Sequence, residues 1–235
     1  MTAQRRVGIF GGTFDPVHSG HIESARQLVA ALALDTLHFM PCKQHPHHKQ
    51  PGATGEQRLD MLAIAIGGMD KEHSHAIAID DREFHREGMS YTVDSLTDIR
   101  AEQGQDTVLV TVMGSDAFAS LTRWYRWEAL LSLSNICVIE RAGQVPLADI
   151  SDSVLRNLLA DQVSELTMPA GQLVTLSLQP YLVSSTDIRQ TFASQSKADG
   201  RVHKDIEAKV KSFLSADVID YIVDQQLYTA NQSMR

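Results

Sequence analysis

Short apolar runs alternate with helical patterns along most of this chain, and this alternation limits the folds that it can adopt. The runs at residues 7–10, 36–41, 107–114 and 135–141 have the length and the β-branched content of buried strands. Between the first two, apolar residues recur at helical spacing over residues 19–33. The pattern predicts an α/β fold, a Rossmann-like doubly wound parallel sheet with helices on both faces.

Weaker signals complete this outline. Thr54 and Gln57 have the spacing of a capping box and predict the start of a helix that reaches Ile66. Further strands are expected at 75–80 and 173–178, and further helices at 92–101, 154–159, 202–214 and 218–226. At 235 residues the chain fits one domain, with a core over 1–182 and a C-terminal helical subdomain over 183–235. Residues 142–172 are hard to interpret and could be an insertion packed on one edge.

Composition narrows the classes of function. The formal net charge is -8 and no basic stripe occurs, which argues against a nucleic-acid partner. Two distant cysteines, Cys42 and Cys137, form neither a disulfide framework nor a zinc motif. No stretch approaches the roughly 20 apolar residues of a membrane span, so no membrane partner is expected. We expect a cytoplasmic protein, and the sequence leaves a homo-oligomer open.

The turn after the first expected strand carries the residues that suit a ligand. Open α/β sheets bind ligands at the carboxyl ends of their strands, and glycines there let the backbone approach a phosphate. Gly11, Gly12 and Thr13 meet this requirement. The spacing matches neither the dinucleotide-binding fingerprint nor the P-loop, which needs a Lys before Ser or Thr.

Two histidines follow at the start of the expected helix. His18 and His21 are three residues apart, so both imidazoles can lie on one face of its first turn, with Gly20 leaving room between them. Imidazoles placed over an anion donate hydrogen bonds, which are stronger when charge-assisted. The plain alternative is that both histidines are capping or surface residues.

The stretch "GGTFDPVHSGH" resembles the signature of the nucleotidyltransferase superfamily that carries a (T/H)xGH motif. It is most similar to the bacterial nicotinate mononucleotide adenylyltransferases. Other segments resemble that family in the expected order, and the resemblance covers the chain except about residues 142–172. They are a proline-histidine loop at Pro46-His47, Arg58 in "QRLDML", "SYTVDSL" at 90–96, "MGSD" at 113–116 and "VSSTDIR" at 183–189.

The resemblance implies an enzyme of NAD biosynthesis that transfers the adenylyl group of ATP to nicotinate mononucleotide, with Mg²⁺ bound through the ATP phosphates. It implies catalytic roles for His18, His21 and Arg189. The residues expected to bind ATP are Gly11, Gly12, Thr13, Phe14, His18, His21, Gly114, Asp116, Ser184, Ser185, Thr186 and Arg189. Those expected to bind the mononucleotide are His47, Tyr91, Thr92 and Trp124, with His48 as an alternative to His47.

Simpler structural interpretations stand beside these assignments. Residues 184–186 also fit an ordinary capped helix start, and Asp116 also fits a helix N-cap. Trp124 could be core packing, as we expect for Trp127. Lys49 and Arg141 could contact phosphate or be solvated surface cations.

The function also has alternatives. One is a related transferase that uses nicotinamide mononucleotide or another phosphorylated acceptor. The other is a nucleotide-binding regulator without catalysis.

Overall fold

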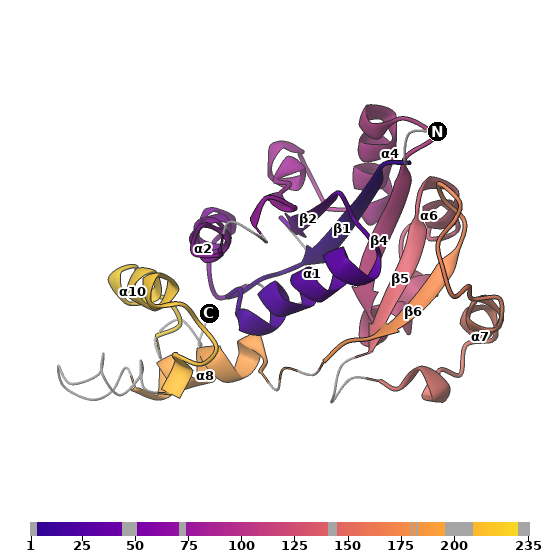
Figure 1. Cartoon of the computed structure of the whole chain (residues 1–235). Coiled ribbons are helices and arrows are strands. Elements are labelled where there is room, and N and C mark those ends of the chain that lie inside the picture. The colour runs from indigo at the N-terminus through magenta and orange to yellow at the C-terminus, as the bar shows by residue number, and fades with distance from the viewer. Residues whose placement is uncertain are drawn as a thin grey trace.

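A six-stranded, all-parallel sheet forms the centre of the molecule, in the order β3-β2-β1-β4-β5-β6 (Figure 1). The structure is a computed structural model that describes residues 4–43, 51–70, 74–140, 145–179, 181, 183–195 and 209–229. The strands are β1 (Arg6–Gly12), β2 (Thr36–Pro41), β3 (Ile77–Ile79), β4 (Val108–Gly114), β5 (Asn135–Glu140) and β6 (Leu173–Ser177). This confirms the doubly wound parallel sheet expected from the sequence.

The direction of winding reverses between β1 and β4. From β1 the chain moves outward through β2 and β3, and then returns to add β4 on the other side of β1. Phe10 of β1 is level with Val112 of β4, and Gly11 is level with Met40 of β2. The carboxyl ends of these three strands therefore open onto the switch point where such sheets bind ligands.

Helices cover both faces of the sheet, and each face has its own apolar cluster (Figure 1). One face packs Phe10 and Val110 against α1, α2, α8 and α10, and the other packs Ile9 and Leu109 against α4, α5, α6 and α7. This alternation along β1 and β4 is what a strand covered on both faces requires. The helices are α1 (Ser19–Ala31), α2 (Gly55–Gly67), α4 (Thr92–Gln103), α5 (Ser115–Phe118), α6 (Glu128–Leu133), α7 (Ser153–Ala160), α8 (Ser185–Gln195) and α10 (Ala216–Asp224).

Local sequence signals fix several of these boundaries. Thr54 caps α2 and accepts a hydrogen bond from the Gln57 N–H, and the Gln57 side chain accepts the Thr54 N–H in return. The strand expected at 75–80 is shorter, because only Ile77–Ile79 pair with β2.

The region between β5 and β6 is not an insertion. Two parallel neighbours in one sheet need a crossover, and α7 lies in the connection between β5 and β6. Asp152 caps α7 by accepting the N–H groups of Val154 and Leu155, and Leu155 is fully buried. The helix expected at 154–159 is confirmed as α7, and the segment that the sequence left open as an insertion is the crossover between β5 and β6.

The C-terminal helices pack on the same face of the sheet as α1 and α2. Ile188 of α8 and Ile222 of α10 are buried in that cluster, and Tyr221 donates to Asp60 of α2 at 2.6 Å. Most of the helix expected at 202–214 lies outside the described residues. None of the helices in the described part of the chain is long and apolar enough to cross a membrane.

Candidate active site

The two histidines of the opening turn stack on each other at the start of α1. Their ring centroids are 3.8 Å apart with an angle of 30° between the planes, and His18 is only 5% exposed. His18 is the N-cap residue of α1, and its backbone N–H donates to Nδ1 of His21 at 3.3 Å. His18 therefore caps the helix, as the plain alternative expected, and its ring also stacks on that of His21. Because Nδ1 of His21 accepts this bond, the neutral ring carries its proton on Nε2.

Glycine is required within this turn for packing. A Cβ on Gly20 would lie 3.0 Å from the His18 ring and 3.1 Å from Val183, and a Cβ on Gly12 would lie 2.7 Å from the Phe14 ring. Both contacts are closer than ordinary van der Waals distance. The small residues between the histidines and before Phe14 therefore let the imidazoles and the aromatic ring sit against the backbone.

Phe14 supports the histidines from the core side. Its ring is buried and meets His21 edge-on with centroids 5.1 Å apart, and it also contacts Phe10 and Phe39. Phe14 adopts a left-handed backbone conformation with φ of 50°. Any contact of Phe14 with a nucleotide would have to come from its backbone, because its side chain is occupied in the core.

The start of α8 lies against the same turn. Ser184 caps this helix, since its Oγ accepts the Asp187 N–H at 3.1 Å. Ser185 Oγ donates to the Pro16 carbonyl at 3.0 Å, and Arg189 Nη1 donates to the Asp15 carbonyl at 2.6 Å. The structure therefore brings the segment 184–189 to the histidine turn, although about 170 residues separate them in the chain.

A cavity of about 340 Å³ opens at the carboxyl ends of β1, β2 and β4. The lining residues expected from the sequence are Gly11, Gly12, Thr13, Thr92, Gly114, Asp116 and Trp124. The lining residues not expected are Ile9, Met40, Cys42, Glu83, Ser90, Thr111, Val112, Met113 and Ala117. His18 lies at the edge of a second cavity, of about 460 Å³, that α1, α2 and the start of α10 enclose.

Three expected ligand residues have distinct settings around the first cavity. Asp116 is exposed and lies inside α5, whose N-cap is Gly114, so the N-cap alternative for Asp116 was wrong. Trp124 lines the cavity and donates from Nε1 to Ser120 Oγ at 3.3 Å. Tyr91 does not line it; its ring packs on Tyr125 with centroids 4.6 Å apart.

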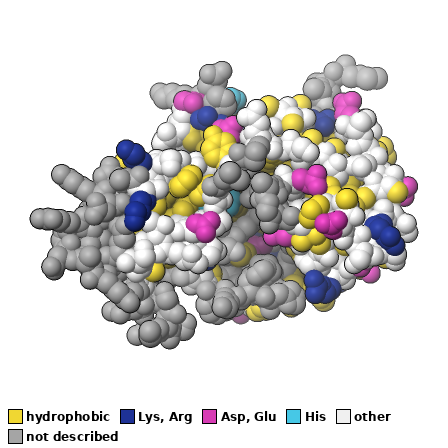
Figure 2. All heavy atoms as spheres, turned by 90° about the horizontal axis from the view of Figure 1, so that it is seen from below, with side chains coloured by type: hydrophobic (Ala, Val, Ile, Leu, Met, Phe, Trp, Pro, Cys, Tyr) yellow, Lys and Arg dark blue, Asp and Glu magenta, His cyan; other side chains and the backbone are white. Residues whose placement is uncertain are grey.

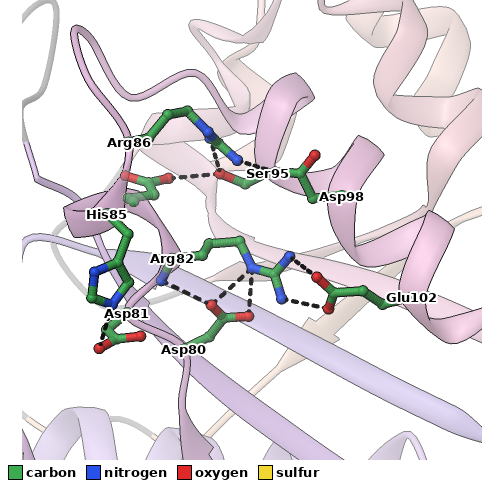
Figure 3. Close-up of polar contacts among 9 residues, drawn as sticks. Asp80, Asp81, Arg82, His85, Arg86, Ser95, Asp98 and Glu102 are labelled. Atoms are coloured by element: carbon green, nitrogen blue, oxygen red, sulfur yellow. Dashed lines mark hydrogen bonds and ion pairs between the residues drawn. The ribbon is translucent and has the colours of Figure 1, made fainter.

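A polar network braces the segment that carries Ser90 and Tyr91 (Figure 3). Arg86 Nη1 donates to Ser95 Oγ at 3.1 Å, and Arg86 also pairs with Asp98 of α4. Arg82 of the preceding segment forms ion pairs with Asp80 and with Glu102, which lies farther along α4. The short helix η1 (Arg82–His85) is thereby fastened to α4 at two points.

Glu83 belongs to this network, and its carboxylate lines the wall of the cavity. It is 5% exposed, one oxygen accepts the Ser95 hydroxyl at 3.2 Å, and the other has no hydrogen-bond partner among the described residues. No spacing rule in the sequence identifies Glu83, because it reaches the cavity through the pairing of β3 with β2. A free acceptor in the wall suits a ligand that brings a hydroxyl or a positive charge.

Arg58 fastens the floor of the cavity and is 1% exposed. Its guanidinium donates to the Thr13 carbonyl at 2.7 Å and to the Cys42 carbonyl at 2.8 Å. Burial raises the pKa of the Cys42 thiol above its usual value of 9.0, although nearby Arg58 opposes this shift. Arg58 therefore holds the ends of β1 and β2 together, and Cys42 remains a neutral thiol at neutral pH.

Figure 2 shows the molecule from the end where the strands finish. Histidine is visible near the middle of this face, with acidic and apolar side chains around it. Among the described residues, no three His, Cys, Asp or Glu side chains are grouped so as to hold a metal ion. His47, His48, Lys49 and Arg141 lie outside the described residues.

Comparisons with known proteins agree with this geometry. Residues 9–191 match the cytidylyltransferase-like family. The chain is 42% identical over 189 residues to a probable nicotinate-nucleotide adenylyltransferase of Cellvibrio japonicus, covering 78% of this chain and 85% of that protein. It is 38% identical over 233 residues to the protein of the same name in Pseudomonas putida, covering 97% of each.

A solved structure supports the same fold. The Plasmodium falciparum nicotinic acid mononucleotide adenylyltransferase complexed with NaAD superposes with a TM-score of 0.72 over 96% of this chain and 98% of that one. Sequence identity is 19%, so this likeness concerns the fold alone.

Proposed function

From the premise that this chain belongs to the cytidylyltransferase-like family, and within it to the nicotinate-nucleotide adenylyltransferases, we propose roles for its residues in that reaction. The enzyme is a nucleotidyltransferase of NAD biosynthesis. It transfers the adenylyl group of ATP to nicotinate mononucleotide and releases pyrophosphate. The observation that carries the assignment of roles is the stacked pair His18 and His21, at the switch point of the sheet and beside Arg189.

The proposed reaction needs no proton transfer to or from the protein. A phosphate oxygen of the mononucleotide forms a bond to the α-phosphorus of ATP, and the bond from that phosphorus to the pyrophosphate oxygen breaks. The attacking phosphate is already an anion at neutral pH, so no protein base is needed. Catalysis then rests on holding two anions in line and stabilising charge on the phosphorus in flight.

His18 and His21 supply that stabilisation in this proposal. The Nε2–H of His21 lies on the opposite side of the ring from its capping bond, and we propose that it donates to an α-phosphate oxygen when ATP binds. Arg189, together with Ser184, Ser185 and Thr186, would receive the β- and γ-phosphates at the start of α8, where helix N–H groups favour anions. Removing one preorganised donor of this kind costs about a hundredfold or more in rate.

The cavity at β1, β2 and β4 is the proposed acceptor site. Trp124 offers a flat ring for the pyridine, and Thr92, at the start of α4, offers an N–H and a hydroxyl for its carboxylate. Tyr91 would contribute backbone and would shape the rim through Tyr125. Gly11, Gly12, Thr13, Gly114 and Asp116 also line this cavity, and we propose that the two nucleotides meet along them.

The donor set fits a magnesium ion that arrives with ATP. Around the histidine turn the imidazoles, hydroxyls and guanidinium suit phosphate rather than Mg²⁺, and the one buried carboxylate there, Asp15, already accepts three hydrogen bonds. The ion would be held by ATP phosphate oxygens, and it would neutralise charge on the departing pyrophosphate. The cytoplasmic location, the homo-oligomer left open and the subdomain boundary near residue 183 stay predictions.

Pyrophosphate release from ATP tests this proposal, with nicotinate mononucleotide compared against its nicotinamide counterpart. We expect a strong preference for the acid, and a loss of about a hundredfold or more in kcat for His18→Ala. His85→Ala is the matched control, because His85 is an exposed histidine paired with Asp81. Preference for the amide would overturn the acceptor assignment, and unchanged kcat in His18→Ala would overturn the role of the histidine turn.

A further inference from the structure

The buried carboxylate of Asp15 joins segments that lie far apart in the sequence. Asp15 sits in the turn between β1 and α1 and is 4% exposed. Its Oδ2 accepts the Gly52 N–H at 2.8 Å, and its Oδ1 accepts the Ala53 N–H at 3.1 Å and the Tyr228 hydroxyl at 2.8 Å. Three donors from two other segments therefore fix this carboxylate.

Arg189 is held by the same residue. Its Nη1 donates to the backbone carbonyl of Asp15 at 2.6 Å, and its Nη2 donates to Thr186 Oγ1 at 3.2 Å. The Asp15 carboxylate oxygen Oδ2 is 3.7 Å from Nη1, which is beyond hydrogen-bonding distance. One third of the Arg189 side chain is exposed, so its remaining donors can face a ligand.

Tyr228 keeps the 3.7 Å contact between the Asp15 carboxylate and the Arg189 guanidinium from closing into a hydrogen-bonded ion pair. Its hydroxyl is buried, and burial together with the neighbouring Asp15 carboxylate raises the pKa of the phenol far above its usual range. The hydroxyl is therefore a permanent donor. Without it, Oδ1 of Asp15 would lose one of its two partners, and the carboxylate could turn toward the guanidinium of Arg189, which lies 3.7 Å from Oδ2.

We propose that Tyr228 is a positioning residue for the reaction: by holding Asp15, it keeps the guanidinium of Arg189 turned toward the pyrophosphate end of ATP. The inference rests on the proposed function of Arg189. It assigns a role to the far C-terminal part of the chain, where the Tyr228 hydroxyl donates to Asp15 in the turn that precedes the histidines. The hydroxyl acts through Asp15 and Arg189 and touches no substrate.

The chain offers a matched pair of tyrosines for the test. Tyr228→Phe removes the hydroxyl that reaches Asp15, and Tyr221→Phe removes the hydroxyl of α10 that reaches Asp60 on the exposed side of α2. We expect Tyr228→Phe to lower kcat/KM for ATP about tenfold and to weaken binding of inorganic pyrophosphate by a similar factor. KM for nicotinate mononucleotide should change less than about twofold, and Tyr221→Phe should leave all three values unchanged.

A double-mutant cycle identifies the route of the effect. In an Arg189→Lys background, Tyr228→Phe should cause little further loss, because the group that it positions has been replaced. Equal behaviour of Tyr228→Phe and Tyr221→Phe would overturn the proposal, as would an undiminished loss in the Arg189→Lys background. If Tyr228→Phe does not fold, Asp15→Asn gives the same test, since its amide has one acceptor oxygen for three donors.

Calorimetry with pyrophosphate separates this inference from the proposed function. If the wild-type protein forms no dinucleotide but Tyr228→Phe binds pyrophosphate more weakly than Tyr221→Phe, the reaction is wrong and the positioning role stands. If the wild-type protein is active and both variants bind pyrophosphate equally, the positioning role is wrong and the reaction stands.

Discussion

The hydrogen bond into His21 decides which atom of its ring can meet a phosphate. Since the His18 N–H donates to Nδ1, the outward donor is Nε2–H. A glutamine places its amide nitrogen near the position of Nε2, whereas an asparagine reaches only as far as Nδ1. We therefore expect His21→Gln to lose about tenfold in kcat and His21→Asn about a hundredfold, measured as pyrophosphate release. An asparagine variant as active as the glutamine variant would show that Nε2 is not the donor.

The rate at which Cys42 is alkylated can be used to test whether a ligand occupies the proposed acceptor cavity. Burial raises the pKa of Cys42 above 9.0 and raises that of the fully buried Cys137 to about 12, so both thiols should react slowly at neutral pH. Only Cys42 lines the cavity. Iodoacetamide should label Cys42 faster as the pH rises above 9, and nicotinate mononucleotide should slow this labelling several-fold. Cys137, read by mass spectrometry in the same sample, is the internal control, and labelling of Cys42 that ignores the mononucleotide would place the ligand elsewhere.

At the scale of elements, η1 and α4 act together on the segment between them, which carries Ser90 and Tyr91 and which we call the acceptor loop. Arg86 ties η1 to Ser95 in the first turn of α4 and to Asp98 near its middle, whereas Arg82 ties it to Glu102 at the far end (Figure 3). Arg86→Met should raise KM for nicotinate mononucleotide about tenfold, because the loop loses a charged hydrogen-bonding anchor. KM for ATP should change little.

Arg82→Met is the control for that variant. It removes the ion pairs with Asp80 and Glu102, which lie away from the loop, so both KM values should stay within about twofold of the wild type. Thermal unfolding of the two variants checks that they differ in kinetics rather than in folding. If both variants raise KM for the mononucleotide alike, the loop depends on η1 as a whole and not on Arg86.

At the scale of the whole molecule, some features depend on residues close together in the sequence, and others depend on contacts between distant segments. The capping box of Thr54 and Gln57 and the six strands depend on near neighbours, and the sequence predicted them, although β3 is shorter than expected. Glu83 reaches the cavity only because β3 pairs with β2, and Asp15 meets Tyr228 across 213 residues. Contacts of this kind depend on strand order and helix packing, for which local periodicity carries no signal.

His38 couples the stability of the whole fold to pH. It lies on β2, and burial lowers its pKa below the usual 6.5, an effect that Arg82 and Arg5 reinforce and that Asp80 and Glu102 oppose. As the pH falls through 6.5, the unfolded chain gains a proton that the folded chain resists, so this contribution to stability is lost toward acid. Chemical unfolding from about pH 8 to about pH 5 should show a smaller decline in unfolding free energy for His38→Gln than for the wild type. The difference should amount to about 1.4 kcal/mol for each unit by which the folded pKa is depressed, and parallel curves for the two proteins would rule out His38 as the titrating group.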